Sequence, residues 1–199
     1  DGVPGISQPE MKTGDVFSAE RINAIAKRVT DRMSTLGYAF ATANPNPEAD
    51  REKRQVAFTI VVDPGRRVYV RRVNIAGNNR TRDEVIRREV RQYESAWFDS
   101  DRVRLSRDRI DRLGFFESVT VDTPAVPSAP DQVDVNVTVK ERATGNIQLG
   151  AGYSSAEGLV LSAGISQQNL FGSGNALSLE LNTSKANRVI AMAHTDPYV

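Results

Sequence analysis

Few residues of this chain combine a type and a spacing suited to catalysis. The single histidine, His194, is followed by Asp196 two positions later, and serines are frequent elsewhere. Positions two apart on a strand share a face, and no nucleophile is placed between these two, so a catalytic triad is not expected. We interpret His194 as an ordinary strand residue.

Two glycine-rich stretches lack the features of a nucleotide-binding loop. The Gly-Ala-Gly run at 150–152 has neither the third glycine nor the following helix of a dinucleotide loop, and the Gly-Ser-Gly run at 172–174 is typical of a hairpin turn. Carboxylates sit on charged helical segments, where solvated ion pairs are commoner than acid–base catalysis. The chain has no cysteine, which excludes disulfides and thiolate metal sites. We therefore expect no catalytic residue, no cofactor and no metal site.

The composition is that of an ordinary folded protein. The 199 residues, 39% hydrophobic and 26% charged, allow one or two domains. The net charge is +1, and the arginines between Arg80 and Arg112 alternate with carboxylates, which indicates an ion-paired helix surface and no nucleic-acid partner. No signal peptide and no apolar run long enough for a membrane-spanning helix appear, so we expect a mature fragment or a soluble chain.

The elements that would position any site begin with residues 66–142, which have the pattern of one complete α+β unit. A strand is predicted up to the turn-forming residues 77–79. Thr81 and Glu84 have the spacing of a capping box, so a helix is expected from there to about Tyr93. A second helix should run from about Asp99 to Leu113, followed by strands at 118–122 and 133–140. Both helices should cover one face of a three-stranded sheet, with 133–139 in its middle strand. The side chains expected to be buried against it are Ile86, Val90, Val103, Ile110, Leu113 and Phe115.

Residues 1–65 resemble a second copy of this unit whose opening strand is missing. Ser18 can cap a helix with one apolar face, which Gly37 would end. An alternating strand begins at Val56, 19 positions after Gly37 (56 − 37), and the matching strand begins at Val133, 19 after Gly114 (133 − 114). The repeat is therefore 77 residues long (114 − 37). The proline-rich stretches 44–50 and 124–131 are predicted as loops joining the last two strands of each copy.

After Arg142 the character of the chain changes. Residues 143–199 hold five charged side chains and seven of the 14 glycines. Apolar residues alternate with small polar ones in segments separated by turns, which is typical of transmembrane barrel strands. Alternation alone leaves an antiparallel sheet of a soluble sandwich as the alternative.

Several motifs in a fixed order carry a resemblance to a known family. The central unit resembles a polypeptide-transport-associated (POTRA) domain. The run VKER at 139–142 with Gly145, NLFGSG at 169–174 and DPY at 196–198 resemble the junction and first barrel strands of outer-membrane protein assembly factors of the BamA type. The resemblance implies an α+β fold, with two helices on a three-stranded mixed sheet in each POTRA domain, followed by antiparallel strands of an incomplete outer-membrane β-barrel. The expected domains are a POTRA domain lacking its first strand at 1–65, a complete POTRA domain at 66–142, and about four barrel strands at 143–199.

The family also implies a function and a location. Its members assemble and insert β-barrel proteins into the outer membrane without catalysis, with their POTRA domains in the periplasm. The implied partners are accessory lipoproteins, unfolded outer-membrane proteins and, through the barrel, the lipid bilayer. Two alternatives stay open: a POTRA-barrel transporter that secretes a dedicated partner protein, and a soluble interaction module.

Two candidate binding sites follow from the resemblance. Arg87 and Glu94 are seven positions apart, so they would share a face of the predicted helix, and they match positions at which the family docks an accessory lipoprotein. The family's strand order would leave the strand at 118–122 at an open sheet edge, able to accept an extended client segment by strand addition. The residues of this edge are Ser118, Val119, Thr120, Val121 and Asp122.

Overall fold

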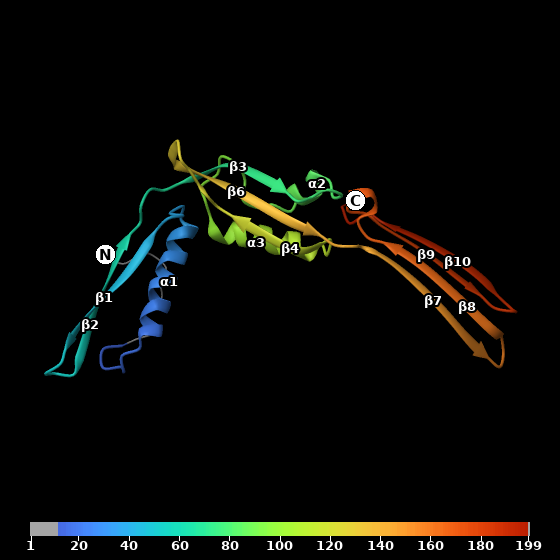
Figure 1. Cartoon of the computed structure of the whole chain (residues 1–199), viewed down its shortest axis with the longest axis horizontal. Coiled ribbons are helices and arrows are strands. Elements are labelled where there is room, and N and C mark those ends of the chain that lie inside the picture. The colour runs from blue at the N-terminus through green and yellow to red at the C-terminus, as the bar shows by residue number, and fades with distance from the viewer. Residues whose placement is uncertain (1–11, 199) are drawn as a thin grey trace. The chain divides into compact units, whose positions relative to one another are not determined.

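A computed structural model of the chain describes residues 12–198 (Figure 1). The first eleven residues of the predicted domain 1–65, and Val199 at the end of 143–199, lie outside this part. The described residues form two compact units, each built from several segments. Unit 1 holds the described residues up to Asn74 with Arg91–Ser106 and Asp122–Asn136; unit 2 holds Ile75–Val90, Arg107–Val121 and the described residues from Val137 onward.

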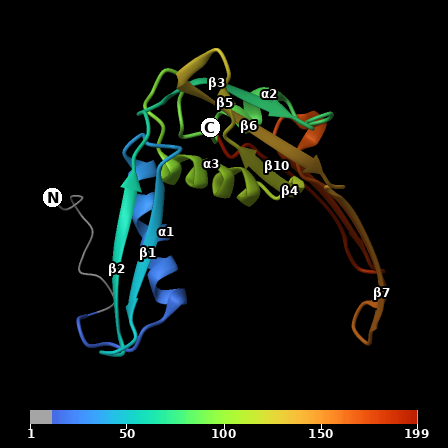
Figure 2. The same cartoon turned by 60° about the vertical axis from the view of Figure 1, so that its left-hand side comes forward.

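In unit 1, helix α1 (Ala19–Thr35) lies along the hairpin of β1 (Thr42–Asp50) and β2 (Gln55–Asp63), as both ribbon views show (Figure 2). The helix begins where predicted, because the Ser18 hydroxyl accepts a hydrogen bond from the Arg21 amide at 3.4 Å. The predicted apolar face is buried except for Leu36, the C-cap residue, which is 37% exposed, and Gly37 follows with a φ of +102°. The buried residues of α1 are Ile22, Ile25, Ala26, Val29 and Met33.

The two stretches predicted as loops belong instead to hairpins. Residues 44–50 form most of β1 and pair with β2 in antiparallel register. The prolines at 45 and 47 are compatible with a strand, because residues two apart direct their backbone nitrogens to the same side, which is the unpaired side of this edge strand. In the stretch 124–131, β5 (Ala125–Val126) and the start of β6 (Ala129–Glu141) pair around a short turn.

The central sheet has the order β3-β6-β4, with β3 at Tyr69–Ala76 and β4 at Phe116–Asp122. The prediction that 133–139 lies in the middle strand is therefore confirmed. Arg71 on β3 contacts Asp134 on β6. Further along β3, Asn74 contacts Asn136, which is also further along β6, so these two strands run parallel.

Only one face of the central sheet is buried. Val133, Val135, Val137 and Val139 are at most 3% exposed, whereas Asp134 and Asn136 between them are half-buried and Thr138 and Lys140 are exposed. The buried apolar residues include Val85 and Ile86 of α2 (Asp83–Arg87) and Ile110 of α3 (Ser100–Arg112). None of the helices within residues 12–198 is long and apolar enough to cross a membrane.

Four of the six side chains predicted to be buried in the central unit are buried. Ile86, Val90, Ile110 and Phe115 confirm the prediction, whereas Val103 and Leu113 are only half-buried. The two exceptions lie near opposite ends of α3. The middle of that helix buries a polar residue, Ser106, which is 2% exposed.

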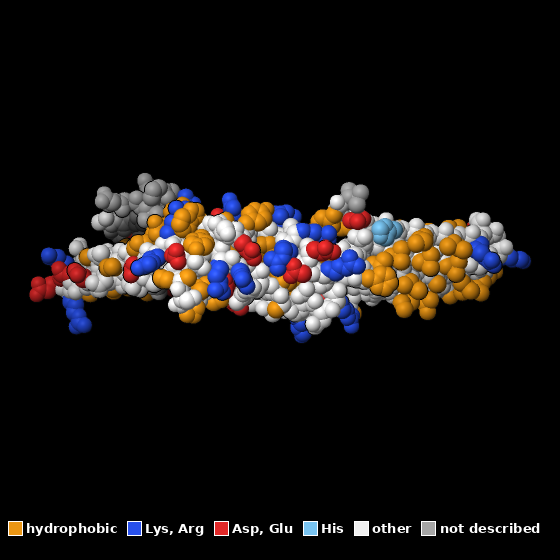
Figure 3. Space-filling view, turned by 90° about the horizontal axis from the view of Figure 1, so that it is seen from above, with side chains coloured by type: hydrophobic (Ala, Val, Ile, Leu, Met, Phe, Trp, Pro, Cys, Tyr) orange, Lys and Arg blue, Asp and Glu red, His pale blue; other side chains and the backbone are white. Residues whose placement is uncertain are grey.

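Unit 2 ends in four antiparallel strands in the order β10-β9-β8-β7. Their bounds are β7 Gly145–Ser154, β8 Gly158–Gln167, β9 Ala176–Thr183 and β10 Arg188–Thr195, with a short 3-10 turn, η1 (Leu170–Gly172), before β9. Alternate apolar side chains are exposed and form a continuous hydrophobic patch over these strands (Figure 3). The most exposed of these side chains are Leu149, Tyr153, Met192 and Ile147.

Candidate binding surfaces

The segment that should carry the lipoprotein site is helical over a shorter range than predicted. Helix α2 spans Asp83–Arg87, not 81 to about 93, and its N-cap residue is Arg82. The capping box at Thr81 does not form, because both polar groups of this residue have other partners. Its amide donates to Glu141 Oε1 at 2.6 Å, and its hydroxyl accepts from Asn169 Nδ2 at 2.8 Å.

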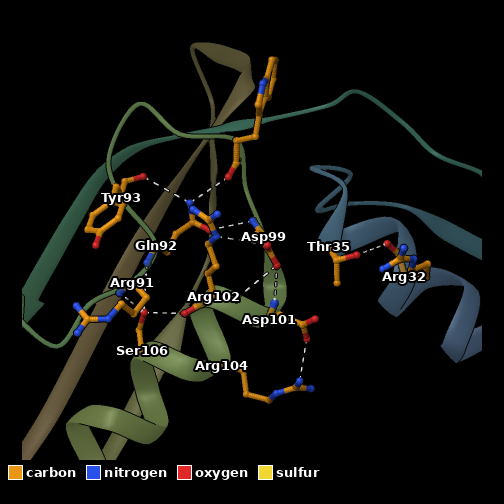
Figure 4. Close-up of polar contacts among 11 residues, drawn as sticks. Arg32, Thr35, Arg91, Gln92, Tyr93, Asp99, Asp101, Arg102, Arg104 and Ser106 are labelled. Carbon is orange, nitrogen blue, oxygen red and sulfur yellow. Dashed lines mark hydrogen bonds and ion pairs between the residues drawn. The ribbon is translucent and has the colours of Figure 1, made fainter. Parts of the chain in front are cut away.

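Polar side chains hold the chain after α2 in a non-helical path (Figure 4). Ser106 Oγ accepts from the Arg91 amide at 2.7 Å. The Gln92 side chain, which is 0% exposed, donates from Nε2 to the Trp97 carbonyl at 3.1 Å and accepts at Oε1 from the Asp99 amide at 2.9 Å. These bonds satisfy backbone groups that a continuing helix would use itself.

The two predicted lipoprotein contacts, Arg87 and Glu94, do not share a helix. Arg87 is the last residue of α2, and its guanidinium pairs with Asp83 one turn earlier, Nε to Oδ2 at 2.7 Å. Glu94 lies beyond the helix, where its Oε1 accepts from the Val73 amide at 2.9 Å. The two residues also belong to different compact units.

The predicted client edge lies on β4, at one end of the sheet order. Ser118, Thr120 and Asp122 are exposed, Val119 is 7% exposed and Val121 is half-buried. Toward β6, Lys140 Nζ lies 2.8 Å from Glu117 Oε2. One backbone carbonyl of β4, that of Val119, accepts from Arg107 Nε at 3.3 Å.

The opposite sheet edge, on β3, is covered by the chain itself, a feature that sequence reasoning missed. The Val70 amide donates to the Ala96 carbonyl at 2.9 Å, and the Ser95 amide donates to the Val70 carbonyl at 2.7 Å. Tyr69 and Trp97 form an antiparallel bridge. The sequence carried no periodic signal for this pairing, because the side chains that hold the segment, Gln92 and Ser106, are polar and prove to be buried.

Within unit 2, Glu141 joins the end of β6 to the segment before α2. Its carboxylate accepts from the amides of Arg80 and Thr81. Burial alone would raise the pKa of Glu141, but these hydrogen bonds outweigh it and hold the pKa below its ordinary value.

Two turns beside the antiparallel strands, one before β9 and one after β10, contact residues 80–89 in unit 2. The Arg82 amide donates to the Gly172 carbonyl at 3.0 Å, and a Cβ at Gly172 would collide with the Arg80 carbonyl. After β10, the Tyr198 hydroxyl donates to Glu89, and the Arg88 guanidinium lies over the Tyr198 ring at 3.2 Å from its centroid. Burial and the carboxylate of Glu89 raise the pKa of Tyr198.

His194 and Asp196, the pair considered in the sequence, have separate neighbours. This residue lies on β10 opposite Leu177, and Asp196 accepts instead from the Tyr198 amide at 2.9 Å. Residues 12–198 contain no group of three or more His, Cys, Asp or Glu side chains that could hold a metal ion.

Comparison with known proteins gives a consistent result. The POTRA family, described as surface antigen variable number repeat, matches residues 7–65 and 68–142. The outer membrane protein assembly factor BamA of Neisseria meningitidis serogroup B is 40% identical over 188 residues, covering 94% of this chain and 24% of that protein. The BamA of Nitratidesulfovibrio vulgaris is 33% identical over 189 residues, covering 94% of this chain and 24% of that protein.

Two solved structures match as well. The crystal structure of Haemophilus ducreyi BamA lacking POTRA domains 1–3 has a TM-score of 0.82 and 36% identity, covering 95% of this chain and 36% of that one. The POTRA3-5 structure of Haemophilus influenzae BamA has a TM-score of 0.63 and 36% identity, covering 66% of this chain and 52% of that one. The chain spans about a quarter of the length of the curated BamA relatives named above. The chain therefore belongs to the POTRA family, in the BamA-type arrangement of POTRA repeats followed by antiparallel strands.

Proposed function

We propose that this chain is part of a protein that assembles β-barrel proteins and inserts them into the outer membrane without catalysis. The observation that carries the proposal is the direct passage from a POTRA sheet to antiparallel strands with an exposed apolar face. Only residues 142–144 separate β6 from β7. The protein lies in the outer membrane, where strands from 143 onward contact the bilayer, and its POTRA domains, 1–65 and 66–142, lie in the periplasm.

Unfolded barrel proteins are the proposed clients, and β4 is the proposed receiving edge. An extended client segment adds to an unpaired strand through main-chain hydrogen bonds, so its affinity depends little on its sequence. The two edges of the central sheet differ in this respect, since the beginning of β3 is already paired with residues 95–98. Client addition is therefore expected at Ser118–Asp122.

Site-specific photocross-linking tests this edge. A photoreactive amino acid at Thr120, an exposed position of β4, should cross-link a urea-unfolded porin diluted into the assay. The same amino acid at Arg72, an exposed position of β3, is the matched control and should give little product. Equal yields from both positions, or product at Arg72 alone, would remove β4 as the receiving edge.

An accessory lipoprotein is the second proposed partner, with Arg87 and Glu94 as candidate contacts. The Arg87 side chain is 45% exposed beside Asp83, so its guanidinium can form charge-assisted bonds with a partner carboxylate. Arg87→Glu should weaken capture of the purified lipoprotein, and a charge reversal on the lipoprotein should restore it. The control is Arg104→Glu, since Arg104 is also paired one turn away on an exposed helix surface. Unchanged capture by folded Arg87→Glu would exclude this contact.

A further inference from the structure

An open pocket of about 650 Å³ lies where the chain passes from the POTRA sheet to the antiparallel strands. Its lining residues all belong to unit 2, and we call it the junction pocket. Most of them come from the segment before α2, from residues 141–145, from the end of β8 and from the turn η1. The client edge on β4 and the candidate contacts Arg87 and Glu94 do not line it.

The junction pocket carries an excess of positive charge. Arg80 and Arg142 line it, and both residues are exposed. The one carboxylate among its described lining residues is that of Glu141, which already accepts from the amides of Arg80 and Thr81. Two guanidinium groups therefore outnumber one carboxylate whose oxygens are engaged, so the pocket favours an anion.

Arg142 is held at the pocket by two hydrogen bonds. Its amide donates to the Phe115 carbonyl at 3.1 Å, and its Nε donates to the Gly114 carbonyl at 2.7 Å. These bonds fix the backbone and the near side of the guanidinium group. The two terminal nitrogens, Nη1 and Nη2, are the donors with which a guanidinium binds a phosphate group.

The exposed apolar face of the antiparallel strands begins beside this pocket. Gly145 on β7 pairs with Gln167 on β8, and both line the pocket. The next pair on the same face is Ile147 with Ile165, which are 70% and 55% exposed. Two strand positions span about 7 Å, and the polar layer on each side of a bilayer's hydrocarbon core is about 5–8 Å thick. A bilayer that covers the hydrophobic patch of Figure 3 therefore places its headgroups at the junction pocket.

The turn η1 presents an aromatic ring at the same level. Phe171 lines the pocket, is 86% exposed and has a φ of +51°, which bulky residues rarely adopt. Its neighbours fix this conformation: the Leu170 amide donates to the Asn175 carbonyl at 2.8 Å, and Gly172 is buried. A strained backbone that exposes an apolar ring indicates a functional position, and aromatic rings are enriched at the headgroup level of membranes.

We propose that the junction pocket binds the headgroup of an anionic phospholipid from the membrane leaflet next to the POTRA domains. Arg80 and Arg142 bind its phosphodiester, and Phe171 lies against the glycerol and the first acyl carbons. This inference rests on the proposed placement of the strands from 143 onward in the bilayer. A lipid bound here holds residues 142–144, which link β6 to β7, at the membrane surface.

Native mass spectrometry tests the site with the 199-residue chain released from non-ionic detergent micelles that contain phosphatidylglycerol. The unaltered chain should retain this lipid in preference to phosphatidylethanolamine. Arg80→Gln combined with Arg142→Gln should weaken retention at least about tenfold, because the charge-assisted bonds are lost. Arg188→Gln is the matched control and should retain the lipid normally. Arg188 is an exposed arginine at the far end of the same sheet, opposite Thr183.

The single variant Arg80→Gln tests the charge without disturbing the junction. It keeps the bonds of Arg142 and the amide bond of residue 80 to Glu141, so the chain should fold normally and retain less lipid. Normal retention by this variant and by the folded double variant overturns the site.

A competition experiment distinguishes a lipid from a free phosphate compound. Glycerol phosphate has no acyl chain, so it should compete on the order of a hundredfold more weakly than dihexanoyl-phosphatidylglycerol, as expected if about four methylene groups are buried. Phe171→Ala should reduce this difference. Equal competition by the two compounds, with no effect of Phe171→Ala, makes the pocket a general anion site and overturns the lipid assignment.

A separate readout reports on the proposed membrane placement itself. A photoreactive amino acid at Leu149, which is 82% exposed on the apolar face, should cross-link the lipid acyl chains in the same micelles. Cross-linking at Leu149 without any effect of the arginine substitutions overturns the pocket site and retains the membrane placement. Absence of cross-linking at Leu149 overturns both.

Discussion

At the residue scale, the carboxylate of Glu141 shows how one side chain decides the local structure. Thr81 and Glu84 have the spacing of a capping box, yet Thr81 is 2% exposed and its amide binds Glu141. A sequence pattern records local preferences, whereas this bond joins residues 60 positions apart. The helix start could therefore be approximated from the sequence, but its cap could not.

Removing the Glu141 carboxylate should destabilise the fold. Glu141→Ala leaves the amides of Arg80 and Thr81 without their acceptor, which costs about 1–3 kcal/mol of unfolding free energy. Lys140→Ala, which breaks an exposed ion pair on the neighbouring residue, should cost less than about 1 kcal/mol. Denaturant unfolding at neutral pH measures both variants, and equal losses would contradict this role of Glu141.

The same bonds predict a pH dependence with a definite sign. The pKa of Glu141 lies below its ordinary value of 4.5, so the unfolded state binds a proton more readily than the folded state. The stabilisation from Glu141 is complete above about pH 4.5 and is lost as the pH falls through the lower folded pKa. Between pH 5 and 2, unfolding free energy should therefore fall less steeply in Glu141→Gln than in the unaltered chain. Parallel profiles would contradict the assignment, since Asp134, whose pKa is also lowered by its bond to Arg71, is unchanged in both.

At the element scale, the long periodic elements were predictable and the irregular ones were not. Alternating valines predicted β6, and a clear apolar face predicted α1, because burial enforces these periods directly. Strand β1 was missed because prolines usually mark loops, although an unpaired edge tolerates them. The pairing of residues 95–98 with β3 was missed because the buried side chains of Gln92 and Ser106 hold this stretch, and neither residue follows a helical or strand period.

The number of strands in each sheet predicts a difference in local stability. The described N-terminal sheet has two strands, β1 and β2, whereas the central sheet has four, β3, β6, β4 and the short β5, with the valines of β6 fully covered. A two-stranded sheet buries little apolar surface and depends on its helix for stability. Hydrogen exchange should therefore show weaker protection of amides in 18–62 than in 66–142. Greater protection of β2 than of β6 would contradict this expectation.

At the scale of the whole molecule, unit 2 combines POTRA segments with all four antiparallel strands. The motifs NLFGSG and DPY, which the sequence offered only as a family resemblance, prove to be the turns that contact residues 80–89. The contacts of these motifs could not be predicted from their spacing in the sequence, because the contacting residues are about a hundred positions away. Tyr198 and Glu89, for example, are 109 positions apart. Because of these contacts, we expect the four antiparallel strands β7–β10 and the α2 segment to unfold together.

A matched pair of glycine substitutions tests this coupling. Gly172 and Gly158 have φ values of +74° and +73°, so alanine introduces the same backbone strain at both. A Cβ at Gly172 collides with the Arg80 carbonyl, whereas at Gly158 it meets nothing within 4 Å. In a membrane mimetic, Gly172→Ala should therefore increase hydrogen exchange both in α2 and in the turn before β9, while Gly158→Ala should affect only the β7–β8 turn. Asn169→Ala removes the bonds of this side chain to Thr81 and to the Gly174 amide at a residue whose φ is +57°, without a collision at Arg80, and should reproduce the effect of Gly172→Ala more weakly. If exchange in α2 stays unchanged in both Gly172→Ala and Asn169→Ala, the two parts of unit 2 unfold independently and the coupling is absent.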